Sequence, residues 1–223
     1  MKTKFIAIEG LDGSGKETQT NLLYEKLKKR QNNVLKLSFP DYKSKSSDLV
    51  KMYLSGEISK NADEINAYAA SSFYSADRYI SFIKNWKEHY EAGSIILTDR
   101  YTTSNQIYQT AKLQKKSWKE FIEWIEDFEY KKLSLPSPDL VIFLNVPVEI
   151  SQQLMLKRYS GNEAKKDIYE SNVEFLKKCH ASAMYCAEKL NWQVINCAEN
   201  NKLKKIDEIH SCVIKIVDKF LNR

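Results

Sequence analysis

Cysteine and histidine are scarce in this sequence, and long hydrophobic runs are missing. Its 223 residues include four cysteines and three histidines. The cysteines form no C-x-x-C pair and stand at no metal-binding spacing from a histidine, so we expect reduced thiols rather than a disulfide scaffold or a zinc module. No uncharged apolar run approaches about 18 residues, and the opening MKTKFIAIEG has too few apolar residues for a signal peptide. We therefore expect a soluble, cytoplasmic protein without a membrane partner.

Linkers, internal repeats and low-complexity segments are also missing. With 43% apolar residues, a chain of this length buries a core of its own, which argues against intrinsic disorder. We therefore expect one domain over residues 1–223. Lys and Arg total 35 against 29 for Asp and Glu, a formal charge of +6. This modest excess favours an anionic partner, and the lack of a basic stripe with interleaved aromatics argues against nucleic acid.

Short apolar runs alternate with helical patterns along the chain. The expected strands are Phe5–Ile8, Asn33–Phe39, Ser94–Thr98, Asp139–Val146 and Gln193–Cys197. Helical stretches such as Thr18–Arg30 and Ala67–Trp86 lie between them. Continuous apolar strands joined by helices predict an α/β fold, namely a five-stranded, mostly parallel sheet with helices on both faces. Because such sheets bind ligands beyond the carboxyl ends of their strands, we expect the site in the segments that follow those ends.

A phosphate-binding motif follows the first expected strand. Residues 10–16 read GLDGSGK, which fits G-x-x-x-x-G-K between a strand and a helix. The glycines let successive backbone N–H groups turn inward around phosphate oxygens, the helix adds the positive end of its dipole, and Lys16 adds a mobile charge. The expected phosphate-binding residues are Gly10, Leu11, Asp12, Gly13, Ser14, Gly15, Lys16, Glu17 and Thr18.

The residue after Lys16 departs from this motif. The usual Ser or Thr, whose hydroxyl ligates Mg²⁺, is replaced by Glu17, which Thr18 follows. We expect Glu17 to point outward or to contact Mg²⁺ through water, with Thr18 as a substitute donor. Asp99, at the end of the third expected strand, can orient the water shell of the same ion, and Arg100 can grip phosphoryl oxygens bidentately.

Further motifs follow the phosphate loop. They are Phe39-Pro40-Asp41-Tyr42, Tyr74-Ser75-Ala76-Asp77-Arg78, Asp99-Arg100-Tyr101, Ser104-Asn105-Gln106-Ile107-Tyr108-Gln109 and Leu135-Pro136-Ser137-Pro138-Asp139. Together with GLDGSGK, and in this order and spacing, they resemble the motifs of the thymidylate (dTMP) kinases, from Lys4 to about Trp192. The resemblance implies the P-loop NTPase fold of nucleotide kinases, with ATP and dTMP as substrates and residues 10–18 as the ATP site.

The resemblance also implies contacts with the base of dTMP. Tyr74 matches the aromatic residue that stacks on thymine, and a flat ring suits a flat base. Arg78, on the same helical face, matches the arginine that hydrogen-bonds the base. Ser104, Asn105 and Gln106 match the segment that reads the rest of the pyrimidine edge.

Contacts with the sugar and the acceptor phosphate follow from the same resemblance. Tyr108 matches the aromatic residue beside the sugar 2′ position, and Asp12 matches the acid near the 3′-hydroxyl. Tyr42 and Arg100 match contacts with the phosphate, and Phe39 belongs to the turn that presents Tyr42. The expected catalytic residues include Lys16, Asp99 and Arg100, and the candidate metal ligands are Asp99 and Glu17.

Three positions depart from the family pattern. Asp41 stands where many members carry arginine, Gly13 where some carry an arginine in the phosphate loop, and Asn145 where aspartate is frequent. Members without the loop arginine usually supply cations from a mobile lid. We therefore expect a lid at about residues 157–170, with Arg158 as its catalytic cation because a planar guanidinium can bridge two oxygens.

The expected reaction is transfer of the γ-phosphoryl group of ATP to the 5′-phosphate of dTMP, with Mg²⁺ bridging the donor oxygens. Two alternatives stay open. The acceptor could be another nucleotide or a deoxynucleoside, or the chain could bind nucleotides without turnover. The resemblance also implies a homodimer, for which the apolar stretch Ile65–Phe82 is a candidate interface.

Overall fold

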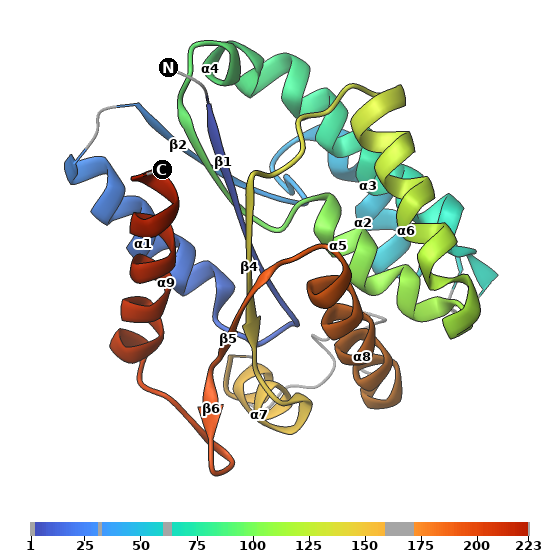
Figure 1. The fold of residues 1–223 in the computed structure, drawn as a ribbon. Helices are drawn as coiled ribbons and strands as arrows, with labels where there is room; N and C mark the ends of the chain where they lie inside the picture. The colour runs from blue at the N-terminus through green and yellow to red at the C-terminus, as the bar shows by residue number, and fades with distance from the viewer. Residues whose placement is uncertain (1–2, 31–32, 60–63, 159–171, 223) are drawn as a thin grey trace.

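A five-stranded parallel sheet forms the centre of the protein (Figure 1). The computed structural model describes residues 3–30, 33–59, 64–158 and 172–222. The strands lie in the order β2-β3-β1-β4-β5. Their bounds are Lys4–Gly10 for β1, Val34–Ser38 for β2, Ile95–Asp99 for β3, Leu140–Asn145 for β4 and Gln193–Asn196 for β5. The predicted α/β fold is confirmed, because every pair of neighbouring strands in this sheet is parallel.

Helices follow the strands and cover the sheet. They are α1 (Lys16–Arg30), α2 (Asp48–Leu54), α3 (Ala67–Ser81), α4 (Lys87–Glu91), α5 (Thr102–Tyr108), α6 (Trp118–Glu126), α7 (Val148–Arg158), α8 (Val173–Lys189) and α9 (Ile206–Leu221). The π-helical segments η3 (Phe82–Trp86) and η6 (Asp127–Lys132) continue α3 and α6. The 3₁₀ turns η1 (Lys45–Ser47), η4 (Thr110–Lys112) and η5 (Lys115–Ser117) join other elements. A small antiparallel pair, β6 (Ala198–Glu199) and β7 (Lys202–Leu203), precedes α9.

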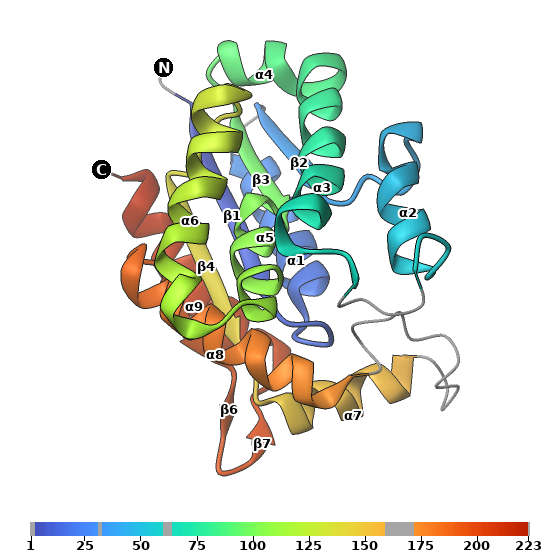
Figure 2. The same cartoon turned by 90° about the vertical axis from the view of Figure 1, so that its right-hand side faces the viewer.

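Alternate residues of β1 face two separate cores. Phe5 and Ala7 pack into a core with α3, α5, α6 and α8, whereas Ile6 and Ile8 pack into a core with α1 and α9. Figures 1 and 2 show these two groups of helices on opposite faces of the sheet. Because β1 is buried on both faces, its apolar residues run without the alternation of a half-exposed strand. The central strand is thereby held firmly on both sides, with its carboxyl end at the lower edge of the sheet in Figure 1.

Side-chain caps fix where several helices begin. The side chain of Asn66 accepts a hydrogen bond from the backbone of Ala69 at the start of α3, and Asn172 caps α8 in the same way through Phe175. In each case the cap satisfies a backbone N–H group that has no partner within the helix. Helix α1 begins at Lys16, as the motif predicts, so the phosphate-binding motif runs directly into its first turn.

The cysteines are all unpaired, as the sequence predicts. Cys179, Cys186 and Cys197 are buried, and Cys212 on α9 is exposed. No helix within the described part of the chain is long and apolar enough to cross a membrane.

Candidate functional site

The phosphate loop lies between the end of β1 and the start of α1, and close packing fixes its glycines. A Cβ atom on Gly10 would lie 2.4 Å from the Oγ atom of Ser14. Gly13 has φ +77°, and a Cβ there would lie 2.4 Å from the backbone oxygen of Ser151 on α7. Ser14 Oγ is buried and has no hydrogen-bond partner among the described residues. A buried hydroxyl without a partner is costly, and a phosphate oxygen would satisfy it.

Lys16 folds back over this loop. Its side chain is buried, and Nζ donates a hydrogen bond of 2.8 Å to the backbone oxygen of Leu11. Burial, assisted by the positive charge of Arg100, lowers the pKa of Lys16 to about 8, against the pull of Asp12 and Asp99. None of the carboxylates among the described residues forms an ion pair with this ammonium group, and anionic phosphates would bring negative charge next to it.

Asp99 and Arg100 stand at the end of β3, which neighbours β1 in the sheet. Asp99 Oδ1 is buried without a hydrogen-bond partner among the described residues, and burial raises the pKa of Asp99 despite Lys16 and Arg100 nearby. Arg100 adopts φ 64°, which turns its backbone sharply away from the strand. This conformation is uncommon for a residue with a Cβ, and strained residues of this kind cluster at functional sites.

Asp12 joins the phosphate loop to the residues after β3. One of its oxygens accepts a hydrogen bond from Arg100 Nη2, and the other accepts one of 2.7 Å from the Tyr108 hydroxyl. Arg100 Nη1 also donates to Ser104 Oγ at 3.2 Å, and its guanidinium lies 5.3 Å from the centre of the Tyr108 ring. Burial alone would lower the pKa of Arg100, but Asp12 raises it well above its ordinary value. The structure thus brings four of the predicted residues into one charged cluster.

Glu9 is a residue that sequence reasoning missed. It is wholly buried at the end of β1, and its carboxylate accepts hydrogen bonds from the Tyr101 backbone, from Thr103 at 2.6 Å and from Ser104 at 3.0 Å. Burial raises its pKa, although Arg100 opposes the shift. Glu9 therefore fixes the turn that presents Arg100. The signal for Glu9 in the sequence was an acidic residue at the end of a wholly apolar strand.

Arg78 and Asn105 meet at a second missed carboxylate, that of Glu129 in η6. Arg78 donates to it through Nε at 2.7 Å and Nη2 at 2.5 Å, and Asn105 Nδ2 donates at 3.2 Å. Gln106 turns elsewhere, because its Nε2 donates to Glu126 at 3.1 Å. It lines a cavity of about 790 Å³ bounded also by Leu140, Asn191 and Lys215. The structure therefore groups Arg78 with Asn105 and separates both from Gln106, whose predicted role stays a prediction.

The predicted aromatic contacts differ in exposure. Phe39 is buried with its ring 5.8 Å from that of Tyr101, so it packs in the core beside the site. Tyr74 is half-buried and meets Tyr53 edge-on at 6.4 Å, and Tyr42 is 53% exposed.

The loop that carries Tyr42 is fixed by Asp77, another residue that the sequence analysis did not single out. Asp77 is buried and accepts from the Asp41 backbone at 2.9 Å and from Ser46 Oγ at 2.5 Å. Asp77, the neighbour of Arg78 in the sequence, thus holds the segment that follows β2.

The remaining predicted residues lie at the border of the site or beyond what the structure describes. Glu17 and Thr18 are exposed on the first turn of α1. The backbone of Arg158 ends α7, and the predicted lid after it, from residue 159 onward, falls outside the described residues. Within the described ranges there is no cluster of three or more His, Cys, Asp or Glu side chains able to hold a metal ion.

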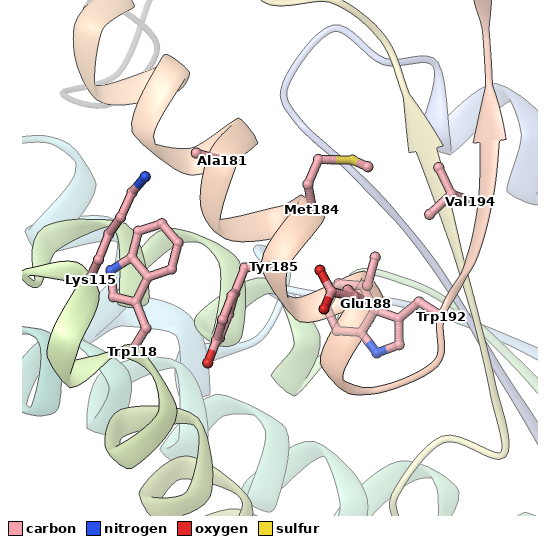
Figure 3. A pocket seen from close by; sticks show the side chains of 9 residues that line it. Lys115, Trp118, Ala181, Met184, Tyr185, Glu188, Trp192 and Val194 are labelled. Carbon is pink, nitrogen blue, oxygen red and sulfur yellow. The ribbon is translucent and has the colours of Figure 1, made fainter.

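A separate cavity of about 680 Å³ lies along α8 (Figure 3). Trp118 and Tyr185 stand on one side of it, and Trp192 and Val194 on the other. None of its lining residues belongs to the predicted site. This hollow is thus distinct from the phosphate loop.

A parallel sheet, a glycine-rich loop with a buried lysine, and an Asp-Arg pair on the adjacent strand together define a P-loop phosphotransferase of the nucleotide-kinase type. Comparison with known proteins narrows this class. The family model described as thymidylate kinase matches residues 8–209. A thymidylate kinase of Plasmodium falciparum is 30% identical over 98% of this chain and 91% of its own length, and one of a Sulfurihydrogenibium species is 33% identical over 82% and 83%.

The chain therefore belongs to the thymidylate kinase family. The solved structure of thymidylate kinase from Candida albicans supports the fold, with a TM-score of 0.70, 22% identity, and coverage of 99% of this chain and 93% of its own. Family membership confirms the predicted activity, ATP-dependent phosphorylation of dTMP to dTDP. Kinases of this type use ATP together with a divalent metal ion.

Proposed function

We propose that this chain performs dTMP phosphorylation by aligning two anions and neutralising their charge, with the predicted residues binding the donor and acceptor phosphates, the sugar and the base. One observation carries the proposal. The phosphate loop with Lys16 and the Asp12–Arg100 pair lie together at the ends of the neighbouring strands β1 and β3. An oxygen of the dTMP 5′-phosphate forms a bond with the γ-phosphorus of ATP while the bond to the β,γ-bridging oxygen breaks, and ADP leaves. The attacking oxygen already carries negative charge, so no general base is required.

On the donor side, the loop N–H groups and Lys16 bind the phosphates of ATP. The unpartnered oxygen of Asp99 fits Mg²⁺, because a carboxylate oxygen with no donor among the described residues is a ligand for this hard cation or for its water shell. When bound, Mg²⁺ neutralises charge on the donor phosphate oxygens. Glu17 is a further candidate ligand through water. Measuring Mg²⁺ dependence in Glu17→Thr and Glu17→Ala tests this role, and unchanged metal affinity in both variants would refute it.

On the acceptor side, Arg100 and Tyr42 bind the phosphate of dTMP. Asp12 and Ser104 hold the Arg100 guanidinium in place, so little side-chain freedom is lost when phosphate binds. Tyr108, which donates to Asp12, lies beside the sugar. Tyr74, Arg78 and Asn105 bind the base, and Arg78 and Asn105 are already held by one carboxylate.

A coupled assay over a nucleotide panel tests the function. We expect phosphorylation of dTMP to exceed that of dUMP, dCMP and thymidine, because the base and the acceptor phosphate both contribute binding. Lys16→Met should lower kcat by about 100-fold or more, because the buried cation that stabilises the negative charge on the transferred phosphoryl group is then missing. A clear preference for another acceptor would overturn the assignment, and tight binding of ATP and dTMP without dTDP formation would favour a protein that has lost turnover.

We further propose that Arg158 delivers a cation from a lid that closes over the donor phosphates. Its support is the position of Arg158 at the end of α7, the helix whose Ser151 backbone packs against Gly13 in the phosphate loop. Arg158→Ala should lower kcat by about 10-fold or more with KM for both substrates changed less than about threefold. Lys157→Ala is the matched control, and equal effects of the two substitutions would remove Arg158 from the mechanism.

The proposal also includes a homodimer. Its support is a set of apolar side chains that are 39–49% exposed on α3 and the π-helical turn that continues it, namely Tyr68, Tyr79, Ile80 and Ile83. A surface of this kind along one helix favours contact with another protein surface. The expected cytoplasmic location stays a prediction.

A further inference from the structure

Glu129 is a buried carboxylate with an unusual number of partners. It is 0% exposed, on the segment η6 that continues the apolar face of α6. Besides Arg78 and Asn105, it accepts hydrogen bonds from Ser75 Oγ at 2.8 Å and Thr102 Oγ1 at 2.6 Å. These donors come from α3 and α5, the two helices that carry the residues predicted to bind the base. One carboxylate therefore connects both helices.

Stability alone gives little reason for this arrangement. A buried ion pair is seldom more stabilising than a well-packed apolar pair, because both charges lose their hydration. Its geometry, in contrast, is restrictive. Oε2 accepts from Arg78 Nε and Oε1 accepts from Nη2, so the guanidinium is held along one whole edge. The opposite edge is left with Nη1, whose one hydrogen bond among the described residues is a long one of 3.5 Å to the backbone oxygen of Tyr101.

Glu129 also decides which way the Asn105 amide faces. Asn105 Nδ2 donates both to Glu129 Oε1 and to the Ser71 backbone oxygen, each at 3.2 Å. Both partners are acceptors, so the amide NH₂ must face them and Oδ1 must face away. A carbonyl oxygen in this orientation accepts a hydrogen bond and cannot donate one. It suits thymine or uracil, in which N3 carries a proton, and opposes cytosine, in which N3 is an acceptor.

We propose that Glu129 is the positioning residue that sets base selection at the acceptor site, by leaving Nη1 of Arg78 as a donor and Oδ1 of Asn105 as an acceptor on the sides turned away from its carboxylate. The inference rests on the proposed function of Arg78 and Asn105, and extends it to a residue that does not touch the substrate. Glu129 thereby favours pyrimidines with a 4-carbonyl and a protonated N3 over those with a 4-amino group.

The test compares Glu129→Gln with the wild type for dTMP and dCMP. Glutamine keeps the shape but can donate to Asn105 Oδ1, so the amide is free to reverse. We expect KM for dTMP to rise about 10-fold or more, KM for ATP to stay within about twofold, and the ratio of kcat/KM for dTMP over dCMP to fall about 10-fold or more. Glu123→Gln, the same change at an exposed position on α6, is the control and should leave all three values unchanged.

A structural role alone would lower both activities by the same factor, so an unchanged dTMP-to-dCMP ratio in a folded Glu129→Gln variant overturns the inference. If that variant does not fold, the dTMP-to-dCMP ratio of Glu129→Asp serves as the test. Aspartate keeps a negative charge opposite Arg78, but its shorter side chain draws the carboxylate away from its hydrogen-bond donors. Wild-type protein that fails to phosphorylate dTMP would overturn the proposed function itself. A wild type that does so, with variants of unchanged selectivity, would overturn only the role of Glu129.

Discussion

At the scale of single residues, the surroundings of Lys16 disfavour its positive charge. Its ammonium group is buried, bonded to the neutral backbone oxygen of Leu11 and opposed by the charge of Arg100. Burial and the charge of Arg100 both disfavour the protonated form, which is why the pKa falls to about 8. Bound phosphates would reverse the balance, because they add negative charge next to the ammonium group.

Nucleotide binding should therefore draw a proton onto Lys16. At a pH of about 8, close to half of the lysine is neutral in the free protein, so we expect uptake of about 0.5 proton per ATP bound. Because phosphates raise the pKa, ATP affinity should be fully present below about pH 8 and decline as pH rises through that value, by at most about tenfold per pH unit. Titration calorimetry in buffers of different ionisation enthalpy measures this uptake.

Lys16→Met provides the control, because it lacks the titrating group and should abolish the uptake. A binding enthalpy of wild-type protein that does not depend on the buffer would contradict the prediction.

Residues within one motif could be predicted from the sequence, whereas residues that depend on distant partners could not. Gly10 to Lys16 form a loop in the predicted place because the motif is local. Glu9 and Glu129 were missed because their partners lie 92 and 51 positions away, at Tyr101 and Arg78. A carboxylate on the buried face of a helical pattern was the available signal for Glu129, and only the fold shows what it holds.

At the scale of elements, the phosphate loop and α7 pack as one unit. Gly13 sits against the Ser151 backbone and the Met155 side chain, so the helix that leads into the predicted lid also supports the loop. This packing explains why a side chain has no room at position 13. An arginine, which some family members place there, would displace α7 in this chain.

Gly13→Ala should consequently destabilise the protein. Alanine at φ +77° costs about 1–2 kcal/mol, and the contact of 2.4 Å with Ser151 adds about 1–3 kcal/mol, which together should lower Tm by roughly 4 to 20 °C. Gly15→Ala is a matched control, because Gly15 has a similar φ of +80°. Its new methyl group, however, would have no atom of the described residues within 4 Å. Thermal unfolding of both variants separates the backbone cost from the packing cost, and equal losses would contradict the role given to α7.

The five strands of the central sheet were predictable to within two residues because their apolar residues cluster in short runs bounded by polar ones, whereas the short pair β6 and β7 was not predicted. The π-helical turns at Phe82–Trp86 and Asp127–Lys132 were not, because a single wider turn barely changes the spacing of apolar residues. The lid prediction at about residues 157–170 stays a prediction, since most of that segment lies outside the described residues.

At the scale of the whole molecule, the two faces of the sheet are covered unequally. Helices α1 and α9 cover one face, whereas α3, α5, α6 and α8 cover the other and include the residues proposed to bind the base. The exposed apolar side chains of α3 lie on the outer surface of this second group. A dimer formed there would bring two acceptor sites near a shared interface.

Ile83→Glu tests this assembly. Placing a charge at the 49% exposed Ile83 should shift the protein from dimer to monomer in sedimentation velocity, because a buried unpaired carboxylate at an interface is costly. Ile206→Glu, at a 53% exposed position on α9 on the opposite face, should leave the dimer intact. A wild type that sediments as a monomer at micromolar concentration would contradict the proposed homodimer.

The uneven burial of the four thiols has a practical consequence for measurement. Cys212 is open to solvent, whereas burial raises the pKa of Cys186 and of Cys197 to about 12, so those two carry almost no thiolate at neutral pH, and Cys179 is shielded in the same way. A maleimide dye would attach to α9 at one place without any engineered cysteine. The three shielded sulfurs react only when the core opens, so the rate of their modification measures transient unfolding.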